Sequence, residues 1–101
     1  MRKISKKQSV INRRLKKVYE EIAYDRSQFC TGCGTHDTLT HSHIIPRSRR
    51  SDLVTDKRNI TYHCLQCHNK WEGKQRIELM DYERNMEYIK EVDIEYYYLI
   101  Q

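Results

Sequence analysis

The sequence predicts a small α+β domain that needs more than a hydrophobic core to stay folded. Leu, Ile, Val and Phe together account for only 21 of the 101 residues, and charged residues make up 33%. A core this thin in a small chain supplies only about 3–5 kcal/mol, so a further staple is expected. Helical periodicity at both ends of the chain and β-branched segments between them indicate the mixed class.

Both ends of the chain are expected to be helical. Within residues 10–25, apolar side chains recur at helical spacing: Ile11, Leu15, Val18 and Ile22. Residues 1–9 show no such period and are expected to form a mobile basic arm. Residues 74–101 form the expected C-terminal helical extension, with Ile77, Met80, Met86 and Ile89 at helical spacing. Residues 92–100 fit either a strand or a continuing helix.

The charge of +5 is distributed unevenly along the chain. Residues 1–19 contain eight basic side chains and no acidic one, whereas residues 71–101 have a net charge of −4. The basic end suits contacts with phosphates on one binding face, and the alternative is a solvated basic tail. No apolar run is long enough to span a membrane and no signal peptide is visible. We therefore expect a single domain in a reducing, cytoplasmic compartment, where cysteine pairs bind metal more often than they form disulfides.

The four cysteines form two Cys-x2-Cys pairs, Cys30 with Cys33 and Cys64 with Cys67. Four thiolates in two such knuckles are a typical ligand set for a tetrahedral structural Zn²⁺. Disulfides and a redox-active pair are the alternatives, but the βαβ pattern of a thioredoxin-like protein is absent. Zinc binding would also add stability that a core with so few apolar residues cannot provide.

Thirty residues separate the two knuckles, more than the roughly 15–20 of a simple zinc ribbon. The excess predicts a structured insertion that the metal closes at its base. Its two apolar, β-branched ends, residues 38–46 and 59–63, are expected to be antiparallel strands joined by a basic loop. Four of the five histidines lie in or beside this insertion.

These residues resemble the HNH endonucleases, the ββα-metal nucleases. The resemblance covers residues 29–73 and rests on His43-Ile-Ile-Pro46-Arg47-Ser48, on Asn59-Ile60 and on Cys64-Leu-Gln-Cys67-His68, in that order. It implies a zinc-framed core of two strands and a helix that hydrolyses DNA phosphodiester bonds with a divalent metal. The chain looks similar to the short phage-type members of the family, which work beside the DNA-packaging terminase.

The resemblance assigns roles to three residues, and their chemistry suits those roles. His43 is the expected general base, because a neutral imidazole accepts a proton near pH 7. Asn59 is expected to hold that imidazole by an amide hydrogen bond. His68, which begins the helix after the second knuckle, is the expected ligand of a catalytic Mg²⁺, Mn²⁺ or Ni²⁺.

The sequence departs from the family pattern at one position. In much of the family an Asp or His precedes the base and binds the catalytic metal, whereas this chain has Ser42, a poor ligand. His41 shares a strand face with His43, and Glu72 lies one helical turn after His68, so either could complete the site. The sequence leaves these three possibilities open.

DNA is the expected partner. Arg47, Arg49 and Arg50 follow the first strand and are expected to bind phosphates. A chain this short leaves little room for a sequence-recognition module, so weak specificity is expected, with targeting supplied by a terminase or another DNA-processing protein. The alternative function is a non-catalytic zinc-binding adaptor for DNA or protein, which would need the cysteines but not His43, Asn59 and His68.

Overall fold

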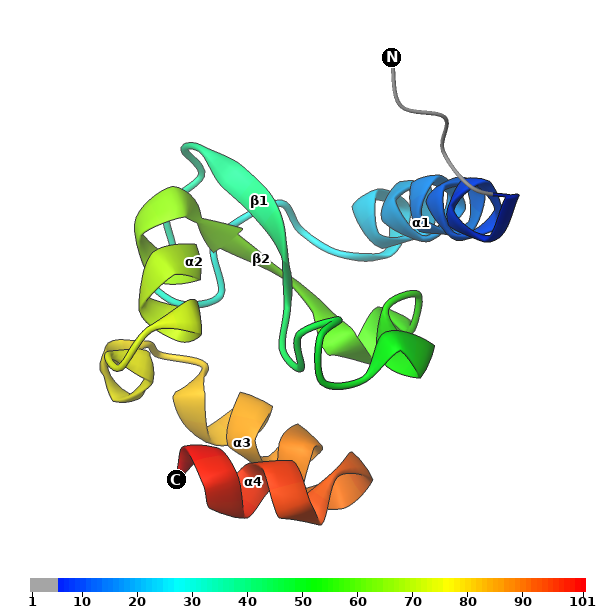
Figure 1. Cartoon of the computed structure of the whole chain (residues 1–101). Coiled ribbons are helices and arrows are strands. Elements are labelled where there is room, and N and C mark those ends of the chain that lie inside the picture. The colour runs from blue at the N-terminus through cyan, green and yellow to red at the C-terminus, as the bar shows by residue number, and fades with distance from the viewer. Residues whose placement is uncertain (1–5) are drawn as a thin grey trace.

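A computed structural model describes residues 6–101 and combines helices with one two-stranded antiparallel sheet, which confirms the α+β class (Figure 1). The elements in chain order are α1 (Lys6–Asp25), β1 (Leu39–His43), η1 (Ser51–Leu53), η2 (Lys57–Asn59), β2 (Ile60–Cys64), α2 (Leu65–Glu72), η3 (Arg76–Glu78), α3 (Tyr82–Val92) and α4 (Ile94–Ile100), where η denotes a short 3-10 helix. No helix in the described part of the chain is both long and apolar enough to cross a membrane.

Helix α1 starts earlier than the hydrophobic period indicates. Residues 6–9 already belong to the helix, so this part of the expected arm is helical, and residues 1–5 lie outside the described part. An amide hydrogen bond of 2.8 Å between Gln8 and Asn12, one turn apart, supports the first turns. The predicted apolar stripe is confirmed, because Ile22 is fully buried and the residues one and two turns before it pack against β2.

The sheet is enclosed on both faces. Its register pairs Leu39 with Cys64 and His43 with Ile60, so alternate side chains face opposite sides. One face packs on α1, where the His41 ring stacks on Tyr19 with centroids 3.8 Å apart. The other face packs on α2, and His63 of β2 contacts Asp81, which directly precedes α3. This double cover explains why every residue of β2 is buried.

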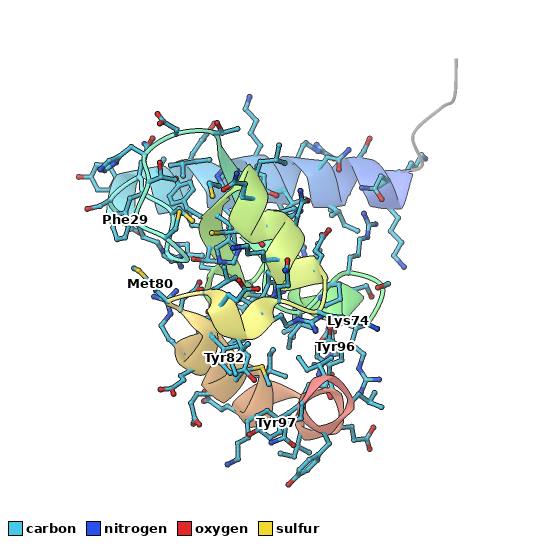
Figure 2. The ribbon with its side chains drawn as sticks, turned by 90° about the vertical axis from the view of Figure 1, so that its left-hand side faces the viewer. Phe29, Lys74, Met80, Tyr82, Tyr96 and Tyr97 are labelled. Atoms are coloured by element: carbon cyan, nitrogen blue, oxygen red, sulfur yellow. The ribbon has the colours of Figure 1, made fainter. Side chains whose placement is uncertain are left out.

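The C-terminal segment departs from the single helix expected from residue 74. Ile77 and Met80 are 73% and 71% exposed, and Leu79 between them is buried. In Figure 2 the Met80 side chain points outward, away from the rest of the protein. The backbone N–H of Met80 donates to Gly32 O at 3.0 Å, which holds residues 76–80 against the first cysteine pair. This tertiary contact overrides the helical period, and a new helix, α3, begins at Tyr82. The open alternative for residues 92–100 is settled as helix α4.

A buried polar cluster around Asp81 joins α3 to the sheet. Oδ2 of Asp81 lies 2.8 Å from His63 Nε2 and accepts hydrogen bonds from Thr31 Oγ1 at 2.7 Å and Asn85 Nδ2 at 2.9 Å. Burial by itself raises the pKa of Asp81, but the hydrogen bonds from His63, Thr31 and Asn85 outweigh it and lower the pKa to about 2. Asp81 therefore connects the first cysteine pair, β2 and α3.

Asp81→Asn should lower the free energy of unfolding by about 2 kcal/mol at pH 7, because a pKa depressed by nearly two units stabilises the ionised folded state by this amount. This contribution is fully present above the ordinary aspartate pKa near 4 and is lost as the pH falls through about 2. Urea unfolding of the zinc-loaded protein measures it. Glu83→Gln, which removes an exposed charge from the same helix, is the control, and equal midpoints for the two variants would contradict the role of Asp81.

Candidate functional site

The four cysteines meet at one point between the two knuckles. Their sulfur atoms all lie within 4.8 Å of one another, and Cys33 Sγ is 3.7 Å from Cys64 Sγ. A tetrahedron with Zn–S bonds of about 2.3 Å has sulfur–sulfur edges of roughly 3.8 Å, so the arrangement fits a zinc ion. The four cysteines can hold a metal ion, as the paired spacing predicts.

Local backbone geometry explains the glycines of the first knuckle. Gly34 has φ +84°, which a residue with a side chain rarely adopts, and a Cβ at Gly32 would lie only 3.0 Å from Cys67 Sγ. The N–H of Gly32 donates to Cys30 Sγ at 3.3 Å. Burial by itself raises the pKa of the Cys30 thiol, but backbone hydrogen bonds from Cys64, Gly32 and Cys33 lower it to about 7. The Cys30 thiolate is thus accessible near neutral pH, whereas burial raises the pKa of the Cys67 thiol.

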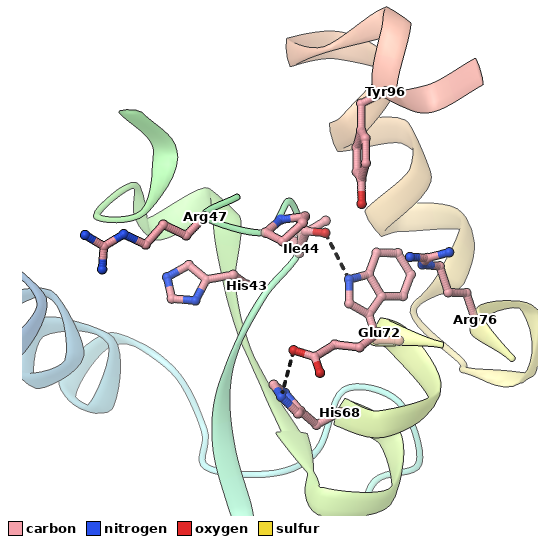
Figure 3. A pocket seen from close by; sticks show the side chains of 9 residues that line it. His43, Ile44, Arg47, His68, Glu72, Arg76 and Tyr96 are labelled. Atoms are coloured by element: carbon pink, nitrogen blue, oxygen red, sulfur yellow. Dashed lines mark hydrogen bonds and ion pairs between the residues drawn. The ribbon is translucent and has the colours of Figure 1, made fainter. Parts of the chain in front are cut away.

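A cleft of about 450 Å³ lies beside the end of β1 and contains two of the three predicted catalytic residues (Figure 3). Residues from β1, the following loop, α2, η3 and α4 line it: His43, Ile44, Pro46, Arg47, His68, Trp71, Glu72, Arg76 and Tyr96. Trp71 is buried and donates from Nε1 to Ile44 O at 2.9 Å, which attaches α2 to the end of β1. Trp71 therefore mainly packs in the core.

The imidazole of His43 is oriented by the backbone of the loop that follows β1. Its Nε2 lies 2.8 Å from Val54 O, and a carbonyl oxygen can only accept, so Nε2 carries the proton. In the neutral ring the lone pair is then on Nδ1, the nitrogen free to take a proton. In Figure 3 the ring lies next to Arg47, on the side of β1 that faces α1.

The amide of Asn59 does not hold the His43 ring, and that expectation is wrong. Asn59 is fully buried; its Oδ1 accepts from Ile45 N at 2.7 Å, and its Nδ2 donates to Ile45 O at 3.0 Å and Leu53 O at 3.1 Å. The side chain therefore joins the two ends of the loop through their backbone. Because that loop also carries Val54, Asn59 acts on His43 only through the position of the loop.

Asn59→Ala should destabilise the fold by about 2–4 kcal/mol, because three buried backbone groups lose their partner. Asn59→Asp should be at least as harmful, since a carboxylate accepts from Ile45 N but cannot donate to the two carbonyls. Thermal unfolding of the zinc-loaded proteins measures both changes. A near-wild-type melting temperature for Asn59→Asp would show that the two donated bonds contribute little.

His68 and Glu72 form a pair on α2 at the cleft. His68 Nε2 lies 3.1 Å from Glu72 Oε1, and these two atoms can hold the same divalent ion. Ser42 is fully buried and His41 is stacked on Tyr19, so neither lines the cleft. Of the three candidates that the sequence left open, Glu72 alone is in place. Within residues 6–101 the cysteine cluster is the single group of three or more close metal-binding side chains.

The three arginines expected to bind DNA lie in different surroundings. Arg47 is exposed at the cleft, where its Nη2 donates to Gln8 on α1 at 2.6 Å. Arg49 instead makes two hydrogen bonds to Asp93, at 3.0 and 3.1 Å, and lowers the pKa of that carboxyl. Arg50 pairs with Asp52 and donates to Val92 O. These two arginines connect the loop to the start of α4, and Arg47 alone of the three lines the cleft.

Two residues of the C-terminal extension also line the cleft, and the sequence pattern did not indicate them. Arg76 and Tyr96 lie beyond the segment that carries the motif. Both come from parts of the chain whose spacing predicts only helical packing. The one available signal was that Arg76 is one of just four basic residues in the acidic segment 71–101.

Comparison with known families agrees with this geometry. The family model described as HNH endonuclease matches residues 30–74, which include both cysteine pairs, the sheet and α2. Comparison with curated proteins and with solved structures finds no significant match. The matched segment contains His43, Asn59 and His68 in the order that the sequence resemblance indicated. Residues 30–74 of this chain therefore match the HNH endonuclease family in both sequence and the arrangement of their elements.

Proposed function

We propose that this protein is a metal-dependent DNA endonuclease that nicks or cleaves with weak sequence specificity. The family match supports a nuclease of DNA in general terms. The observation that carries the proposal is the His43 ring, which lines the cleft with Nε2 bound to Val54 O and Nδ1 left as the basic nitrogen. A histidine with a purely structural role would be buried in the core and would not line an open cleft.

In the proposed reaction, His43 Nδ1 removes a proton from the attacking water as the water approaches the phosphorus atom. The Val54 carbonyl then stabilises the resulting imidazolium, because it continues to accept the Nε2 proton. Asn59 contributes indirectly, because it joins Ile45 and Leu53 and so maintains the loop that carries Val54. This division makes His43 the acid–base residue and Asn59 a positioning residue.

His68 and Glu72 are the residues that would hold the catalytic divalent ion. Their facing nitrogen and oxygen, 3.1 Å apart, supply two ligands of the kinds accepted by Mn²⁺ and Ni²⁺ as well as Mg²⁺. Mg²⁺ commonly uses one or two protein ligands and completes its shell with water and substrate phosphate. When bound, the ion supplies positive charge against the phosphate and the leaving oxygen.

The basic side chains at the cleft and on α1 suit cleavage with weak sequence specificity. Arg47 at the cleft and the basic side chains of α1 carry the positive charge that a phosphate backbone requires, and phosphate contacts carry no base information. Recruitment by a terminase or another DNA-processing protein would then supply the target. That partner is proposed from resemblance to the short phage-type members alone.

The test is conversion of supercoiled plasmid to nicked or linear forms by the zinc-loaded protein. Mg²⁺, Mn²⁺ or Ni²⁺ should support the conversion, and EDTA in excess over these ions should stop it. Glu72→Gln should raise the ion concentration needed for half-maximal activity, whereas Glu78→Gln, outside the cleft, should not. A purified, folded protein that cuts no DNA with any of the three ions would contradict the proposal.

A second candidate function has one observation in its favour. Ser42 replaces the usual metal ligand, and the cleft offers only the His68–Glu72 pair for a catalytic ion. This arrangement suits a non-catalytic zinc-binding adaptor for DNA or protein. Binding of duplex DNA without cleavage, unchanged by added divalent ions, would favour the adaptor over the nuclease.

A further inference from the structure

We propose that Arg76 binds a DNA phosphate at the far wall of the cleft, opposite Arg47. The inference rests on the proposed function, because it names a substrate-binding residue of the same cleft. Arg76 lies outside the matched segment 30–74, so the C-terminal extension would contribute directly to substrate binding.

The guanidinium of Arg76 is placed at the cleft by an aromatic ring. It lies over Trp71, with Cζ 5.5 Å from the ring centroid, and both residues line the cavity (Figure 3). Stacking on a ring leaves the edge of a guanidinium, where its N–H donors are, free for an anion. Arg76 therefore contacts the Trp71 ring and lines the cleft at the same time.

The charge of Arg76 has no carboxylate partner within the described part of the protein. Arg49, Arg50 and Arg58 each pair with a carboxylate. For Arg76, no ion pair or side-chain hydrogen bond occurs among residues 6–101, and its Nε is buried without a partner. A buried donor that lacks an acceptor costs free energy, which a bound phosphate oxygen would recover.

The segment that carries Arg76 is fixed to the zinc-site frame. Leu79, in the same turn, packs into the core beside the cysteines, and the Leu79 N–H donates to Arg76 O at 3.1 Å. The next residue, Met80, bonds to Gly32 in the first knuckle. Arg76 therefore occupies a defined position relative to the cysteines and α2, as a preorganised phosphate contact requires.

The experiment measures binding of a 20-base-pair duplex as a function of salt, with fluorescence anisotropy, in a His43→Ala background that prevents cleavage. Arg76→Ala should weaken binding by about tenfold, since a hydrogen-bonded charge is lost. It should also reduce the slope of log K against log salt by about 0.9, the value for one phosphate contact. Arg76→Lys should keep the slope, because it retains the charge.

Arg84→Ala is the matched control, because it removes one exposed arginine from the same extension away from the cleft. Its affinity should change by less than about twofold. Trp71, the single tryptophan of the chain, adds a local readout: DNA should change its fluorescence in the control but less in Arg76→Ala. If Arg76→Ala does not fold, Arg76→Gln replaces it: this variant removes the charge, keeps a polar side chain, and should reduce the slope by the same amount.

An unchanged salt slope in folded Arg76→Ala or Arg76→Gln would overturn the proposal, and so would equal losses in Arg76→Ala and Arg84→Ala. If either result is obtained and the wild-type protein still cleaves plasmid, the proposed nuclease function is not contradicted. Failure of the wild-type protein to cleave any DNA would instead contradict the proposed function itself.

Discussion

His43→Ala should reduce the rate of plasmid cleavage by about 10²–10⁴-fold, the usual cost of losing a general base. Among residues 6–101 the half-buried side chain makes one polar contact, from Nε2 to Val54 O, so its removal should leave the fold intact. Single-turnover cleavage at saturating divalent ion measures the change. Zinc content and the urea midpoint should match those of the wild-type protein.

His36→Ala is the matched control for this prediction. His36 is exposed in the loop before β1, and its Nδ1 lies 3.0 Å from Gln28 O, so it is a histidine held by a carbonyl outside the cleft. The His36→Ala protein should cleave plasmid at the wild-type rate. If a folded His43→Ala protein cleaves as fast as His36→Ala, the proposed base is wrong and the adaptor function gains support.

Cys33→Ser should leave the chain largely unfolded, with less than one zinc bound per chain. Cys33 is the exposed member of the four, so its loss removes a metal ligand without opening a cavity in the core. Structural zinc contributes about 10–16 kcal/mol in small zinc-finger peptides, as much as the whole stability of many domains. Circular dichroism and metal analysis of the purified protein test the prediction.

Gln66→Ser provides the control, because this exposed residue lies between the two cysteines of the second knuckle and offers no ligand. It should retain about one zinc per chain and a cooperative transition. If zinc-free Cys33→Ser unfolds cooperatively at the wild-type urea concentration, the cysteines do not stabilise the fold through a metal.

Much of the frame was predictable because the determining features are local. A Cys-x2-Cys pair brings two sulfurs together within one turn, so its spacing predicts a metal site without knowledge of the rest of the chain. The apolar stripe of α1 and the β-branched ends of the insertion likewise depend on neighbouring residues. The order of His43, Asn59 and His68 indicated a resemblance to the HNH family, and the match to residues 30–74 agrees with it.

The assignments that failed depend on contacts between distant segments. Asn59 was expected to bind the His43 ring, but packing brings its amide to the backbone of Ile45, fourteen positions earlier. The expected phosphate contact of Arg49 stays a prediction, but its pairing with Asp93, 44 positions away, was likewise not visible in the sequence. A charged or amide side chain near a motif indicates that the residue has a polar partner. The sequence does not indicate which residue that partner is.

The sequence by itself determined the α+β class, the cluster of four cysteines that can hold a metal ion and the match of residues 30–74 to the HNH family, because these follow from composition, short spacing and residue order. Only the tertiary structure decided that Glu72, and neither His41 nor Ser42, accompanies His68 at the cleft. It also brought Arg76 to the opposite wall. These outcomes depend on how α2 and the C-terminal helices pack on the sheet, and that packing reflects many weak contacts that no local pattern encodes.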